Sequence, residues 1–211
     1  MSRYTEAVKL QKELAPTVVT RDAFESIETV CAVDVSYKGC VANAAAVIMD
    51  ARTMEVLEHA TATTRVKIPY VPGLMMLREA GPVMSVLRRL KRNYDVLLVD
   101  GNGQLHPRRF GLACYLGVTL GKPAVGVAKS LLCGTVRKDS VILGGRTVAR
   151  IVRRAEGRRI FVSIGNGISL KTAAKLARSL IMDGQWLPEP LRLADMYSKQ
   201  VPPGTRAAGK L

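Results

Sequence analysis

"DVLLVDGNG", residues 95–103, sets four apolar residues between two aspartates and ends in a glycine-rich turn. A short, continuous apolar run of this kind is typical of a strand that is buried on both faces of a sheet. Asp100 closes the run, where such a strand delivers its last side chain into a cleft. The stretch therefore predicts an α/β sheet with a functional cleft at Asp100.

Three strand-like segments precede this run. "ETVCAVDVSY" (28–37) is rich in β-formers, "VANAAAVIM" (41–49) follows a Lys-Gly turn signal, and "MEVLEHATATTRV" (54–66) continues after Asp50-Ala-Arg. Short turns between consecutive strands predict an antiparallel meander.

Helices and strands alternate after the meander. Helical spacing covers about residues 73–92 and 110–120, and "PAVGVAK" (123–129) has the pattern of a second buried strand. The rest predicts a hairpin at 140–152, a strand at 159–165, and a helix at about 170–182 that Ser169 can cap.

Together these elements predict a mixed α/β sheet flanked by helices. The 211 residues and 48% hydrophobic content suffice for one sizeable core, so we expect a single domain over residues 1–211. Residues 202–211, within "PPGTRAAGKL", are expected to be a frayed tail.

The balance of charge favours a polyanionic partner. Thirty-two Lys and Arg residues against seventeen Asp and Glu residues give a net charge of +15. A basic surface suits nucleic acid or an acidic membrane surface, and it can also be merely solvated. Nucleic acid is preferred, because the basic residues recur along the whole chain and pair mostly as arginines, whose planar fork suits phosphate.

The cellular setting is expected to be cytoplasmic and the protein a monomer that does not contact membranes. "MSRYTEAVKLQKEL" has no apolar core typical of a signal peptide, and no stretch approaches a membrane span. The four cysteines lack metal-site spacing and are expected to be reduced.

Three carboxylates occupy positions where a carboxylate is costly. Asp34 lies inside the first strand on the face of Ala32, Asp100 ends a buried strand, and Glu79 interrupts the apolar stripe of a helix. Singly, Asp34 can pair with an arginine, Asp100 can cap a turn, and Glu79 can face solvent or bind Arg78.

The three carboxylates together indicate a site for a hard divalent cation, Mg²⁺ or Mn²⁺, because such ions prefer oxygen ligands. In a basic chain that binds nucleic acid, such a site indicates phosphodiester hydrolysis by metal-activated water.

Five blocks resemble, in order and spacing, the motifs of the endonuclease V (deoxyinosine 3′ endonuclease) family. The blocks are "VDVSY", "PYVPGLMMLRE", "DVLLVDGNGQLHPRRFG", "PAVGVAKSLLCGT" and "PEPLRLAD". The resemblance implies a ribonuclease H-like fold and a Mg²⁺-dependent DNA repair enzyme. Its expected reaction is cleavage of the second phosphodiester bond 3′ to deoxyinosine, which leaves 3′-hydroxyl and 5′-phosphate ends.

The resemblance also implies site residues. It assigns Asp34, Glu79 and Asp100 to the metal, places His106 near the metal and the scissile phosphate, and makes Lys129 a transition-state cation. Asp195 fits as an outer metal ligand or a group that orients water.

Pro69-Tyr70-Val71-Pro72 is similar to the family's wedge, which is inserted where the damaged base has been extruded. Two prolines fix the loop and a tyrosine can stack in place of a base, although a proline-braced surface loop has the same pattern. Gly73, Gly101 and Gly103 would let backbone amides approach the base or its phosphate, beyond their turn geometry. Arg78 is expected to contact phosphate or to brace Glu79.

Two departures from the family pattern stand out. Asn166 replaces a usual histidine before the last predicted helix, which places the role of that histidine in doubt, and Gln104 stands where apolar residues are usual.

Other functions fit less well. An inosine-specific endoribonuclease is an open alternative, because family members act on DNA or RNA. Another ribonuclease H-like nuclease would not need the Pro-Tyr-Val-Pro loop. A non-catalytic nucleic-acid-binding module would leave the three carboxylates as unexplained repulsion against phosphate.

Overall fold

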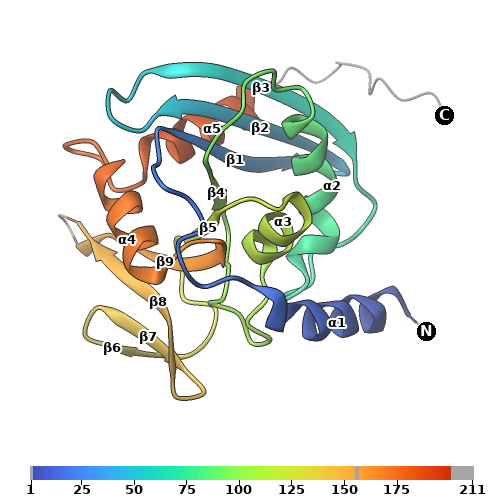
Figure 1. The fold of residues 1–211 in the computed structure, drawn as a ribbon. Helices are drawn as coiled ribbons and strands as arrows, with labels where there is room; N and C mark the ends of the chain where they lie inside the picture. The colour runs from blue at the N-terminus through green and yellow to red at the C-terminus, as the bar shows by residue number, and fades with distance from the viewer. Residues whose placement is uncertain (1, 155–156, 201–211) are drawn as a thin grey trace.

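The computed structural model describes residues 2–154 and 157–200, and the expected tail at 202–211 lies outside the described residues. One nine-stranded sheet runs through the molecule in the order β3-β2-β1-β4-β5-β9-β8-β7-β6, with helices packed against it (Figure 1). The predicted mixed α/β sheet flanked by helices is therefore confirmed.

The strands and helices have the following bounds. The strands are β1 (Thr29–Lys38), β2 (Val41–Asp50), β3 (Val56–Arg65), β4 (Val96–Asp100), β5 (Ala124–Ala128), β6 (Thr135–Arg137), β7 (Ser140–Leu143), β8 (Arg146–Arg153) and β9 (Arg159–Asn166). The helices are α1 (Arg3–Leu14), a short 3-10 turn η1 (Ala15–Thr17), α2 (Met75–Leu87), α3 (Leu112–Leu120), α4 (Leu170–Ser179) and α5 (Glu189–Gln200).

The sheet combines antiparallel and parallel pairing. β1, β2 and β3 form the predicted antiparallel meander, and β4 then pairs parallel with β1, and β5 parallel with β4. The chain passes from β3 at the edge of the sheet to β4 beside β1 through α2, and it crosses from β4 to its parallel neighbour β5 through α3. β9, β8, β7 and β6 extend the sheet antiparallel.

Alternation along the central strands divides the core into two layers. Leu97 and Val99 lie in one hydrophobic cluster with side chains of α2 and α3, whereas Leu98 lies in the other with side chains of α4 and α5. In β1, Val33 belongs to the first cluster and Ala32 to the second, as strand periodicity requires. Helices therefore cover both faces (Figure 1).

Two helices and one strand were not predicted, and one helix is shorter than expected. α1, α5 and the three-residue β6 have no counterpart among the predicted elements. The helix expected at about 73–92 ends at Leu87. Among the described residues, no helix is long and apolar enough to cross a membrane.

The glycine turn after β4 packs closely against the backbone of neighbouring strands. A Cβ atom on Gly103 would lie 2.0 Å from the carbonyl oxygen of Ile164, and one on Gly126 would lie 2.4 Å from the amide nitrogen of Gly103. Backbone atoms cannot give way as a flexible side chain can. This close approach holds the loop after Asp100 against β5 and β9.

Gly103→Ala is therefore expected to lower the free energy of unfolding by at least about 2 kcal/mol, because the new methyl group forces the loop away from β9. Gly81→Ala is the matched control: it lies inside α2, a Cβ there meets no atom within 4 Å, and alanine favours a helix over glycine. Urea unfolding of both variants checks this, and equal stabilities would contradict it.

Candidate active site

Four carboxylates reach a common cavity of about 290 Å³. Asp34, Glu79, Asp100 and Asp195 line it, together with the ammonium-bearing Lys129 and with Val35, Ser36, Met75 and Lys199. The cavity thus brings together all three carboxylates assigned to a metal and two further predicted site residues.

Each acidic residue comes from a different element. Asp34 lies within β1 and Asp100 ends β4, and the parallel register pairs Val33 with Val99, so the two aspartates follow as neighbours at the carboxyl end of β4. Glu79 arrives from α2 and Asp195 from α5. Because α2 and α5 pack on opposite faces of the sheet, the acidic side chains approach the central strands β1 and β4 from both faces.

Hydrogen bonds hold three of these carboxylates. Ser198 Oγ donates to Asp34 Oδ2 at 2.9 Å, and Lys129 Nζ donates to Asp100 Oδ2 at 2.6 Å. Lys199 Nζ binds Asp195 Oδ2 at 2.6 Å, one helical turn along α5. No bond is recorded between the Glu79 carboxyl and another described side chain.

Burial and mutual repulsion disfavour the charged forms of two of the acids. Burial first, and then the charge of Asp100, raises the pKa of Asp34 to about 6. Burial, and then the charges of Asp34 and Asp100, raises the pKa of Glu79 to about 8. Burial opposes the charge on Lys129, but Asp100, Asp34 and Asp195 together outweigh it and raise its pKa. The cavity therefore brings together four acidic side chains and only two lysines, Lys129 and Lys199.

The donor set fits a divalent cation. Carboxylate oxygens are the ligands that Mg²⁺ and Mn²⁺ prefer, and added positive charge would counter the burial and the repulsion that raise the pKa values of Asp34 and Glu79. Among residues 2–154 and 157–200, no three His, Cys, Asp or Glu side chains already stand together as a metal-binding cluster. Lys129 and Ser198 are bonded to two of the acids instead.

A second, narrower pocket of about 40 Å³ adjoins the carboxylate cavity through Met75, which lines both. Tyr70 lines this pocket and is 61% exposed. Gln11 of α1 and Leu132 of the loop after Lys129 also line this pocket. The predicted wedge residue thus stands at the mouth of a pocket next to the acids.

His106 lies in this second pocket and not among the lining residues of the carboxylate cavity. Its Nδ1 accepts the backbone N–H of Arg108 at 3.2 Å, so Nε2 carries the hydrogen and donates to the carbonyl oxygen of Gly73 at 2.9 Å. Burial, and then the charge of Arg108, lowers its pKa to about 4. His106 is therefore neutral at physiological pH, and its contact with a phosphate stays a prediction.

Arg78 supports the start of the Pro69–Pro72 loop. Its Nη1 donates to the carbonyl oxygen of Ile68 at 2.6 Å, and its guanidinium lies 4.0 Å from the ring centre of Tyr37. The backbone N–H groups of Gly101 and Gly103 are also engaged, with the Val127 carbonyl at 3.0 Å and Ser163 Oγ at 2.9 Å. These two amides therefore hold the loop, whereas a substrate contact through them stays a prediction.

Asn166 lies at the far end of the sheet from the acids, where it pairs with Ala124 at the start of β5. Its Oδ1 accepts from Val19 N–H at 3.0 Å, and its Nδ2 donates to the carbonyls of Gly117 and Lys122 at 3.3 Å. The asparagine at this position fastens three segments together.

Sequence reasoning missed Ser198, which donates to Asp34, and several residues that line the two pockets, among them Gln11, Met75 and Leu132. Ser198 follows Asp195 at helical spacing, a signal that needed α5 to be recognised. The local sequence around Gln11, Met75 and Leu132 does not indicate that these residues lie near Tyr70, because their proximity arises only from the fold.

The comparisons with known proteins agree on one family. The Endonuclease V family profile matches residues 12–196. Endonuclease V of Thermofilum pendens is 43% identical over 91% of this chain and 86% of its own length.

Solved structures extend this likeness to the fold. The structure of endonuclease V from Streptomyces avermitilis has a TM-score of 0.87 at 33% identity and covers 94% of this chain and 92% of its own. Endonuclease V from Ciona intestinalis, solved in complex with a 23mer DNA containing an inosine followed by a ribo-adenosine, has a TM-score of 0.85 at 26% identity, covering 94% and 97%.

Proposed function

The chain belongs to the endonuclease V family, and from that membership and its carboxylate cavity we propose that it cleaves inosine-containing DNA in a repair reaction. The bond hydrolysed is the second phosphodiester 3′ to the lesion, which leaves a 3′-hydroxyl and a 5′-phosphate. The observation that carries the proposal is the convergence of Asp34, Glu79, Asp100 and Asp195 with Lys129 in one cavity beside an exposed tyrosine.

Asp34, Glu79 and Asp100 would hold the divalent cation, Mg²⁺ with Mn²⁺ as a substitute. Bound there, such an ion would activate a water molecule and offset charge on the leaving oxygen. The protein's part is to hold Asp34 and Asp100 on the paired strands β1 and β4, and Glu79 on helix α2, so that the three carboxylates face one cavity.

Lys129 and Asp195 complete the cavity. Lys129 extends from the end of β5 and is bonded to Asp100, so its ammonium group can approach charge that develops on the phosphate. Asp195, tied to Lys199, supplies the outer carboxylate that orients water.

Tyr70 supplies the stacking surface. Its ring is exposed between Pro69 and Pro72 and stands over the narrow pocket, so it can occupy the gap that an extruded base leaves. The pocket must open to admit a base. Leu132, which is also exposed and lines the same pocket, provides a second apolar surface.

Asp100→Asn tests the proposed chemistry. It keeps the shape of the side chain but removes a charge that would bind the cation, so we expect at least a hundredfold loss of cleavage on inosine-containing DNA. Binding should remain within about threefold, because phosphate contacts supply most of the attraction.

The assay uses matched oligonucleotides with inosine or adenosine at one position, in DNA and in RNA, with the product ends mapped. Cleavage by the wild type at the second bond 3′ to deoxyinosine is the expected result. Wild-type rates for Asp100→Asn, or equal cleavage of inosine and adenosine strands, would refute the proposal.

Tyr70→Ala tests the proposed wedge. Extruding a base costs a few kcal/mol in a paired duplex and much less in a single strand, and a stacked aromatic returns roughly 1–3 kcal/mol. We therefore expect a tenfold to hundredfold loss on a paired inosine·cytosine duplex, by these same magnitudes, and a clearly smaller loss on a single strand.

Single-turnover rates on paired, mismatched and single-stranded substrates measure the difference. Glu79→Gln is the control, since the loss of a metal ligand should lower the cleavage rate on all three substrates alike. An equal loss of rate for Tyr70→Ala on all three substrates would contradict the wedge role and indicate that Tyr70 only packs on the surface.

A further inference from the structure

One backbone carbonyl at the base of the Tyr70 loop gathers three side-chain donors. The oxygen of Gly73 accepts from Arg108 Nη2 at 2.7 Å, from His106 Nε2 at 2.9 Å and from Gln11 Nε2 at 3.1 Å. A carbonyl oxygen has two lone pairs, so three donors saturate it. This cluster, formed by Gln11, His106, Arg108 and the Gly73 carbonyl, is here named the Gly73 clamp.

Gln11 connects the members of the Gly73 clamp. It is 1% exposed, its Nε2 also donates to the carbonyl oxygen of Phe110 at 2.9 Å, and its Oε1 accepts from Arg108 Nε at 2.6 Å. Both ends of its amide group are therefore satisfied inside the protein. Such a buried and fully bonded polar network fixes one arrangement of the segments that it joins.

The segments joined are three that lie far apart in the sequence. Gln11 belongs to α1, Gly73 ends the Pro69–Pro72 loop just before α2, and His106 and Arg108 follow the glycine turn after Asp100. Gly73 has φ of +75°, and a Cβ atom on it would stand 3.0 Å from Arg108 Nη2. Only a glycine lets the loop close on the guanidinium at this point.

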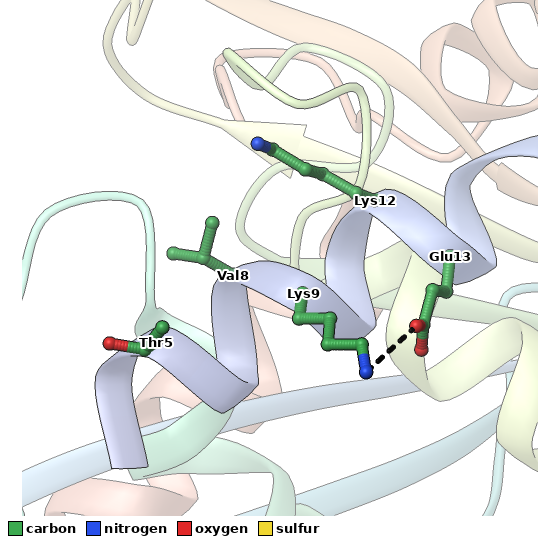
Figure 2. A pocket seen from close by; sticks show the side chains of 5 residues that line it. All are labelled: Thr5, Val8, Lys9, Lys12 and Glu13. Carbon is green, nitrogen blue, oxygen red and sulfur yellow. Dashed lines mark ion pairs between the residues drawn. The ribbon is translucent and has the colours of Figure 1, made fainter. Parts of the chain in front are cut away.

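Few side chains of helix α1 are fully buried, although Val8 and Leu14 also pack against the core. Ala7 and Gln11 are its buried residues, and its solvent-facing side carries an exposed ion pair between Lys9 and Glu13 of 3.7 Å (Figure 2). The helix therefore contributes one interior polar group, and that group is aimed at the base of the Tyr70 loop.

We propose that Gln11 and Arg108 are positioning residues that fix the Tyr70 loop against the loop after Asp100, so that base extrusion and cleavage stay in register. The inference rests on the proposed role of Tyr70. The Tyr70 ring can offset the cost of unstacking only if the loop that carries it keeps its position. The Gly73 clamp holds that loop in place through α1. A single-stranded substrate needs no extrusion from a duplex and should not depend on it.

Gln11→Met tests the inference, because it keeps the length of the side chain and removes every hydrogen bond of the amide. We expect the single-turnover rate on a paired inosine·cytosine duplex to fall about tenfold, and that on a single strand less than about twofold. In the Gln11→Met/Tyr70→Ala double variant the duplex loss should equal that of Tyr70→Ala alone, since both act on one step.

The matched control is the charge-neutral double variant Lys9→Gln/Glu13→Gln, on the outer side of the same helix (Figure 2), which should leave both rates unchanged. Thermal unfolding establishes that each variant is folded. Should Gln11→Met not fold, Arg108→Lys carries the same test, because it keeps the charge and loses the bond to Gln11 Oε1.

Equal losses on duplex and single strand, or additive losses in the double variant, would overturn the inference while leaving the role of Tyr70 intact. A Tyr70→Ala variant that shows no preference for duplex would overturn the role of Tyr70, and this inference with it.

Discussion

The crowding of the half-buried carboxylates of Asp34, within β1, and Asp100, at the end of β4, with the buried Glu79 is the constraint on which the rest of the site depends. Parallel pairing places Asp34 and Asp100 side by side, and α2 adds Glu79 from the other face of the sheet. Lys129 and the Ser198 hydroxyl offset part of the cost, and burial, followed by the mutual repulsion, still raises the pKa values of Asp34 and Glu79. A fold selected for stability alone would place apolar side chains there.

The sequence predicted the sheet well, because strand signals are local. The meander, the buried strands ending near Asp100 and Lys129, and the Ser169 cap of α4 are all confirmed, and Ala32 and Val33 face opposite layers as the alternation required. α1 was missed because its apolar residues are interspersed with charged ones and only Ala7 and Gln11 of the helix are fully buried. Its stability comes from tertiary contacts that no local pattern reveals.

The metal-site residues could be proposed from sequence because a carboxylate inside an apolar run is conspicuous, whereas the clamp that supports Tyr70 could not. Gln11 and Arg108 are ordinary residues of a polar helix and a basic loop, and their meaning arises only when three distant segments meet at the Gly73 carbonyl. His106 lines the pocket of Tyr70, where its neutral ring donates to the Gly73 carbonyl, and its expected place near the metal and the phosphate stays a prediction.

The pH dependence of stability tests the central constraint most directly. A carboxylate whose pKa is raised by folding binds more protons in the folded state, so the folded state loses stability as pH rises from about 4.5 to about 8. In the presence of EDTA, urea unfolding should show that Glu79→Gln is more stable than the wild type at pH 8, by on the order of 2 kcal/mol beyond any difference at pH 4.5. Addition of Mg²⁺ at pH 8 should stabilise the wild type more than the variant. Parallel pH profiles for the two proteins, with no response to Mg²⁺, would contradict the account.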